Sequence, residues 1–218
     1  VVEWMRIHYP ALEMIVTAGC SAGAYGAIGH APLISDIYTD AEVRVIADSG
    51  CGIITDSFLG DSFPQWNARE NMTKPLPSIA DQPTETLALG DAYIAIGEAY
   101  PHIRISQVTT AYDKDQIFYY SVMGGGELDW FDAASNSLTA IRAATPTFRY
   151  YMAPGPVHCV HPYDLTNTRT VNGVRYADWV RSFISDEALP DDVVCEGECT
   201  DDPVCAACAL DSQSSNAC

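Results

Sequence analysis

The stretch IVTAGCSAGAYGA (residues 15–27) decides the fold, because it passes from branched apolar residues, through small residues around one serine, into a helix-forming run. A strand that ends in Gly-x-Ser-x-Gly and enters a helix at once makes a sharp turn that is strained at the serine. Gly19, Ala22 and Gly23 are small enough to let the two backbones approach each other. We therefore predict that Ser21 projects from a sheet edge as a nucleophile. The alternative is a serine that only caps the helix.

Length, composition and charge limit the class of protein. The 218 residues suffice for one domain with a sizeable core, and 48% hydrophobic and 18% charged residues are typical of a globular protein. No apolar run approaches the roughly 18 residues of a membrane span. The formal net charge of −18 makes nucleic acid and anionic membranes poor partners. We therefore expect neither as a partner.

The cysteines indicate an oxidising compartment, because eight are too many for a reducing cytosol. They are Cys20, Cys51 and Cys159 in the body and Cys195, Cys199, Cys205, Cys208 and Cys218 in the tail. Eight cysteines can form four disulfides with none left over, and the polar tail has too few apolar residues to fold without them. Zinc bound by the first four tail cysteines is the alternative. We predict disulfides, because the spacing of the tail cysteines is irregular. We also predict a secreted or periplasmic protein.

Apolar strand candidates alternate with helical stretches along the chain, which is typical of an α/β sheet with parallel strands. Strands are expected at 12–16, 42–47, 103–109 and 147–152, and helices at 24–38, 84–100, 129–144 and 176–185. The chain is expected to divide into an α/β domain at 1–188 and an acidic cysteine-rich tail at 189–218. Residues 49–83 read as a long loop that covers a pocket as a lid. Trp66 and Asn67 in this segment are the expected substrate-binding residues.

Acid and histidine candidates follow the two later strands. Asp113 and Asp115 come after 103–109, and His158 and His161 come after 147–152. The carboxyl ends of parallel strands share one edge of the sheet, where ligands bind. Serine, acid and histidine in this order match the catalytic triad of α/β-hydrolases, in which histidine takes the serine proton and the acid orients the histidine.

Three aspartates compete for the role of the acid. Asp48 follows the strand after the nucleophile strand, but its DSG context also fits a turn. Asp115 lies beside Lys114 and could cap the helix that follows. We predict Asp113, which comes directly off its strand.

Four stretches together resemble the pectin acetylesterase and Notum family of serine carboxylesterases. They are GCSAG (19–23), AYDKDQI (111–117), HC (158–159) and VNGVRYADW (171–179). The resemblance implies an α/β-hydrolase-like fold and the removal of acyl groups from esters, commonly acetyl from pectin, without metal or organic cofactor. It assigns Ser21 as nucleophile, Asp113 as acid and His158 as base. It also assigns the backbone N–H of Ala22 as an oxyanion donor.

Two departures from the family pattern qualify what the resemblance implies. Family members carry a Gly-rich oxyanion segment well upstream of the serine, so we expect these 218 residues to be part of a longer precursor. A polyanionic pectin backbone would be repelled unless the groove is locally basic, with Arg69 and Lys74 as the candidates. The expected function is a serine carboxylesterase for an acyl, above all acetyl, ester of a pectin-like polysaccharide. The alternatives are an esterase or depolymerase for another ester, or a catalytically silent glycan-binding module of the same fold.

Overall fold

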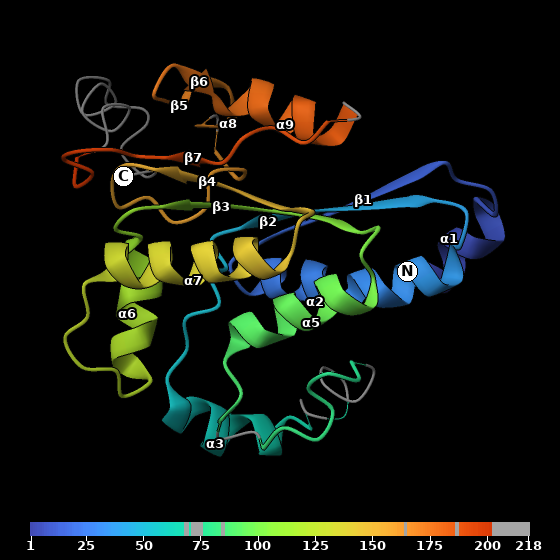
Figure 1. Ribbon diagram of the computed structural model, residues 1–218, viewed down its shortest axis with the longest axis horizontal. Coiled ribbons are helices and arrows are strands. Elements are labelled where there is room, and N and C mark those ends of the chain that lie inside the picture. The colour runs from blue at the N-terminus through green and yellow to red at the C-terminus, as the bar shows by residue number, and fades with distance from the viewer. Residues whose placement is uncertain (68–69, 71–75, 84–85, 164, 186–187, 202–218) are drawn as a thin grey trace.

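The computed structural model describes residues 1–67, 70, 76–83, 86–163, 165–185 and 188–201. Their main element is a five-stranded sheet in the order β1-β2-β3-β4-β7, with every neighbouring pair parallel. Its strands are β1 (Met14–Cys20), β2 (Glu42–Asp48), β3 (Arg104–Thr110), β4 (Phe148–Ala153) and β7 (Val193–Val194). The carboxyl ends of all five strands therefore lie on one edge, as the sequence predicted (Figure 1).

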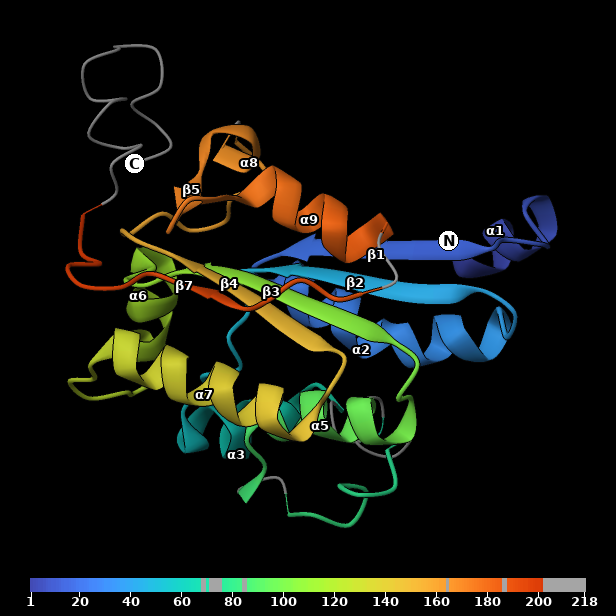
Figure 2. The ribbon, with the colours of Figure 1, turned by 45° about the horizontal axis from the view of Figure 1, so that its top comes forward.

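Helices cover both faces of the sheet, which explains why β2 and β3 are buried over almost their whole length (Figures 1 and 2). One face carries α2 (Ala22–Ile37), α5 (Leu89–Ala99) and α7 (Trp130–Ala144), with α3 (Asp56–Gln65) beyond them. The other carries α9 (Tyr176–Ser185), α8 (Leu165–Thr168) and the hairpin of β5 (Thr170–Val171) and β6 (Val174–Arg175). Helix α1 (Val2–His8) precedes β1, and α6 (Lys114–Val122) follows β3.

Most predicted elements are confirmed within a few residues. The helix at 176–185 is α9, and the helix at 129–144 is α7, which starts one residue later because the Asp129 side chain accepts the Asp132 N–H as its N-cap. The predicted bounds of the first strand, 12–16, are wrong. Strand β1 instead runs to Cys20, because the small residues before the serine continue the ladder with β2.

Two predicted segments need correction. The helix expected over 84–100 begins at Leu89. The Asp91 carboxylate accepts the N–H of Ala88, which makes Ala88 the N-cap of the helix. The loop expected over 49–83 contains α3. Thr55 caps this helix by accepting the Phe58 N–H, and its apolar face is buried in a small cluster with α5.

The start of the tail joins the sheet. Strand β7 pairs with β4, and the N–H of Cys195 donates to the carbonyl of Met152. Cys199 accepts the N–H of Gly155, in the segment that leads from β4 to His158. Residues 193–199 therefore support one part of the candidate site described below.

Two disulfides lie in the described part of the chain, Cys20–Cys159 and Cys195–Cys199. The second uses two of the cysteines of the zinc alternative, whereas Cys205, Cys208 and Cys218 lie outside the described residues. The expectation that no cysteine is left over is wrong for Cys51, which is buried and free in the described structure. The two disulfides indicate an extracellular or periplasmic protein. None of the helices described is both long and apolar enough to cross a membrane.

Candidate active site

Ser21 occupies a strained position between β1 and α2. Its backbone has φ 57° and ψ −122°, a conformation that costs an L-residue of the order of 1–3 kcal/mol. Its N–H donates to the Asp48 carbonyl at 2.7 Å. The side chain makes no cap hydrogen bond to α2. The alternative in which Ser21 only caps the helix therefore lacks the contact that defines a cap.

The turn requires a glycine at position 19, whereas the space around Gly23 would admit a side chain. A Cβ built on Gly19 would lie 2.0 Å from the Gly23 carbonyl oxygen, whereas a Cβ on Gly23 would meet nothing within 4 Å. The backbones of β1 and α2 thus meet at Gly19. The requirement for a small residue at Gly23 is not borne out by its own surroundings.

We expect Gly19→Ala to lower the free energy of unfolding by about 3 kcal/mol or more, because the added methyl overlaps a backbone atom that cannot turn aside. Gly23→Ala is the matched control, and its expected effect is a gain of up to about 1 kcal/mol from helix propensity. Urea denaturation of both variants tests this. Equal stability of the two variants would contradict the close approach at Gly19.

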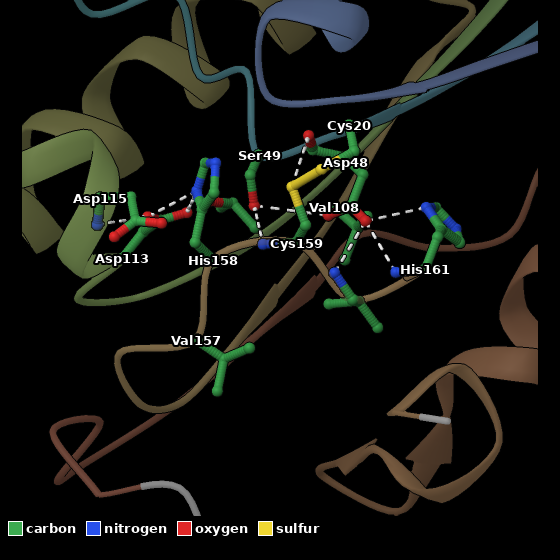
Figure 3. The surroundings of a disulfide bond; sticks show 12 residues. Cys20, Asp48, Ser49, Val108, Asp113, Asp115, Val157, His158, Cys159 and His161 are labelled. Atoms are coloured by element: carbon green, nitrogen blue, oxygen red, sulfur yellow. Dashed lines mark hydrogen bonds and ion pairs between the residues drawn. A yellow bond between two sulfur atoms is a disulfide. The ribbon is translucent and has the colours of Figure 1, made fainter. Parts of the chain in front are cut away.

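His158 and Asp113 form a hydrogen-bonded pair beyond the ends of β4 and β3 (Figure 3). The Nδ1 of His158 lies 2.8 and 2.9 Å from the two carboxylate oxygens of Asp113. The Asp113 side chain is completely buried and that of His158 is 15% exposed. Because an ionised carboxylate only accepts, Nδ1 carries the proton and Nε2 is left as the basic nitrogen. This is the tautomer that a general base requires.

Opposing effects act on the pKa of His158. Burial lowers it, but the hydrogen bond and the charge of Asp113, together with the charges of Asp115 and Asp48, outweigh burial. The pKa of His158 therefore lies above its ordinary value. The carboxylates around the ring stabilise the imidazolium that forms when the histidine accepts a proton.

Distances show which of the three candidate aspartates contacts His158. The carboxylate of Asp48 contacts His161 instead, with its Oδ2 2.9 Å from the Nδ1 of His161. Asp115 donates its backbone N–H to Asp113. Asp113 is thus the carboxylate that contacts His158, as predicted, although its catalytic role stays a prediction.

The Cys20–Cys159 disulfide joins the neighbours of the two other predicted triad residues. Cys20 precedes Ser21 and Cys159 follows His158, and the two cysteine Cα atoms are 5.9 Å apart. Since consecutive Cα atoms are about 3.8 Å apart, Ser21 and His158 are held in the same small region. Ser21, Ser49 and Cys159 all have φ near 60°, so backbone strain is concentrated here.

Gln116, for which the sequence predicts no role, contacts the Asp113 carboxylate. Its Nε2 donates to the Asp113 carboxylate at 2.8 Å, and its backbone N–H donates at 3.0 Å. Asp113 also accepts the Asp115 N–H as the N-cap of α6. The spacing Asp-x-x-Gln resembles a capping box, which is the signal that could have revealed the bond from the Gln116 backbone N–H to Asp113.

An apolar pocket of about 250 Å³ opens beside the serine turn. It is lined by Ala22, Tyr25, Ile28, Gly29, Ile54, Phe58, Phe63, Trp66, Leu89, Ala92, Tyr93 and Ile96. Within the predicted segment 49–83, the pocket is lined by Ile54, by Phe58 and Phe63 of α3, and by Trp66, and a lid role stays a prediction. Trp66, one of the predicted substrate-binding residues, lines this pocket, and its side chain is 61% exposed. Asn67, the other predicted substrate-binding residue, does not line this pocket, and Arg69 and Lys74 lie outside the described residues.

One group of potential metal ligands occurs in the described part of the chain. The sulfurs of Cys20 and Cys159 and a ring nitrogen of His158 lie within 4.8 Å of one another. The sulfurs are bonded to each other and provide no thiolate. In the disulfide form this group is therefore not a metal site.

Comparisons with known proteins identify the fold. No family model and no curated protein matches the chain. Among solved structures, the Wnt deacylase Notum from Drosophila is similar, with a TM-score of 0.51 and 16% sequence identity. The match covers 85% of this chain and 57% of the Notum chain, so the chain spans little more than half the length of that protein. This likeness confirms the predicted α/β-hydrolase-like fold.

Proposed function

We propose that this chain carries the catalytic centre of a serine carboxylesterase, with Ser21 as nucleophile, His158 as general base and Asp113 as the orienting acid. The observation that carries the proposal is the uncapped, strained Ser21, tied through Cys20–Cys159 to a histidine whose Nδ1 contacts a buried carboxylate. The structural likeness to a deacylase agrees with this reaction class. The two disulfides favour action outside the cytosol.

The reaction follows from the arrangement of these groups. His158 Nε2 takes the proton of Ser21 as the hydroxyl oxygen attacks the ester carbonyl, and it returns that proton to the leaving alcohol. The N–H of Ala22, the first residue of α2, has no acceptor within the helix and is available to the oxyanion. Water then hydrolyses the acyl-enzyme by the same steps in reverse order.

The apolar pocket indicates the class of acyl group. It begins at Ala22, beside the nucleophile, and its walls are aliphatic and aromatic side chains of α2, α3 and α5. An acetyl group would leave most of its roughly 250 Å³ empty. We therefore propose that the acyl group is a longer apolar chain, in place of the acetyl group suggested by the sequence resemblance. The alcohol can be a carbohydrate or another small hydroxyl compound.

A fluorophosphonate probe tests the reaction class. The expected result is covalent labelling of Ser21, located by peptide mass spectrometry, and loss of labelling in Ser21→Ala. An unlabelled serine in the folded protein would contradict the esterase. An unlabelled protein that bound glycan would support the catalytically silent module.

A series of p-nitrophenyl esters tests the acyl pocket. Each buried methylene contributes about 0.8 kcal/mol, so kcat/KM should rise about fourfold per methylene from acetate to hexanoate. Gly29→Leu should reduce this rise, because Gly29 lines the pocket and its Cβ position is open. Gly26→Leu is the matched control on the same helix, since its Cβ position is also open but it does not line the pocket. A preference for acetate in the unmodified protein would contradict the acyl assignment.

A further inference from the structure

Asp48 is a completely buried carboxylate that the proposed reaction does not use. It ends β2, between β1 and β3, on the edge of the sheet that carries the candidate site (Figure 3). In the described ranges its ion-pair partner is His161, and no lysine or arginine pairs with it. A buried carboxylate without compensating hydrogen bonds is strongly unfavourable. Its contacts therefore show what holds it in place.

The carboxylate of Asp48 binds the segment that follows His158. Its Oδ2 accepts the backbone N–H of Val160 at 2.7 Å and that of His161 at 2.8 Å. The same oxygen lies 2.9 Å from His161 Nδ1. Charge-assisted hydrogen bonds of this kind are short and directional. They fix the backbone two and three residues beyond His158.

The backbone of the same residue binds the nucleophile turn. The Asp48 carbonyl accepts the Ser21 N–H at 2.7 Å. Next in the chain, Ser49 Oγ accepts the Cys159 N–H at 3.0 Å, and the Ser49 N–H donates to the Val108 carbonyl of β3. Asp48 and Ser49, at the end of β2, thus form hydrogen bonds with both the segment of Ser21 and the segment that follows His158.

His161 is itself held from the other side. Its Nε2 lies 2.9 Å from the hydroxyl of Tyr176, the first residue of α9. Tyr176 is completely buried, and its ring packs against Tyr151 of β4 and Trp179 of α9. Asp48, His161 and Tyr176 therefore form a hydrogen-bonded chain from the catalytic edge to the helix on the far face of the sheet.

We propose that Asp48 is a positioning residue that sets the placement of Ser21 relative to His158, with His161 and Tyr176 holding its carboxylate. The inference rests on the proposed esterase function. It deepens that function, because proton transfer between the two groups requires contact distance. A displacement of about 1 Å between reacting groups can lower the rate about 100-fold.

Asp48→Asn tests the proposal, because it preserves shape but replaces one acceptor oxygen with an amide that donates. Reactive Ser21 is counted by titration with the fluorophosphonate probe, and kcat is expressed per titrated site. We expect kcat per site to fall about 100-fold with little change in KM, as for a displaced catalytic group. Asp40→Asn, the same change at an exposed site before β2, should leave kcat unchanged. A purely structural role would reduce the number of sites and keep kcat per site, which would overturn the proposal.

A pair of substitutions at His161 gives the result if Asp48→Asn fails to fold. Asparagine at 161 keeps a side-chain donor for Asp48, whereas leucine removes it. We expect His161→Leu to lower kcat per titrated site at least tenfold and His161→Asn to recover most of the loss. Equal and normal turnover in both would overturn the positioning role. If the unmodified protein titrates no Ser21, the esterase proposal itself fails, which is a distinct outcome.

Discussion

Replacing Asp113 with asparagine is expected to lower ester turnover about 10⁴-fold, the loss known when a triad aspartate is replaced and the histidine adopts the wrong tautomer. The Asp113 carboxylate accepts the Nδ1–H of His158 and also donors from Asp115 and Gln116. An asparagine amide would be held with its oxygen toward α6 and its NH₂ toward the ring. Nδ1 would then become the acceptor, and the proton would sit on the nitrogen that must receive the serine proton.

The pH profile provides a second measurement on the same variants. His158 must be neutral to act as a base, and its pKa lies above the ordinary value, so kcat/KM should rise with pH and level off above that raised pKa. Asp113→Asn removes the hydrogen bond and the charge that raise the pKa. The rise should therefore move to lower pH. Asp115→Asn, the control, removes only a nearby charge and should shift the rise slightly in the same direction with turnover nearly intact. An unchanged profile in Asp113→Asn would contradict the pairing.

The second large effect is expected from removing the Cys20–Cys159 disulfide with a double alanine substitution. The bond joins residues 139 positions apart. In the chain-entropy model, closing a loop of that length lowers the free energy of the folded state relative to the unfolded state by about 5 kcal/mol. For a protein of this size, a loss of that magnitude lowers the midpoint of thermal unfolding by about 10–20 °C. Differential scanning calorimetry measures it directly.

The Cys195–Cys199 disulfide provides the matched control, because it joins residues only 4 positions apart. Its double alanine variant should lose about 2 kcal/mol in the same model. The variant of the long-range bond should also lose turnover per titrated site, since Ser21 and His158 are no longer tied. Equal thermal shifts for the two variants would contradict the assigned effect of loop length.

The parts of the fold that the sequence predicted are those with local signals. The small residues around Ser21 specify a strand-to-helix turn by themselves, and α9 carries an amphipathic pattern with a definite period. The proline, asparagine and serine residues of 49–83 predict a loop, and Pro64 lies inside helix α3. Burial of Leu59 and Phe63 against Leu89 outweighs the low helix propensity of this proline.

The parts of the candidate site that could not be predicted depend on partners distant in the chain. Asp48 meets His161 across 113 positions, and only the folded sheet brings them together. Eight cysteines allow about 105 pairings, and no local pattern selects Cys20 with Cys159. The chain order of serine, acid and histidine could be read because each follows its own strand.

The strand order of the sheet has a consequence for biosynthesis. From β1 to β4, each strand pairs with the one synthesised just before it, so the described sheet can grow by successive addition as the chain emerges. The serine turn is complete early, but its histidine and the second cysteine arrive about 140 residues later. In the proposed reaction, a nascent chain therefore holds Ser21 without its base until His158 has emerged. The proposed catalytic centre is thus completed late, when the Cys20–Cys159 bond joins the end of β1 to the segment that follows β4.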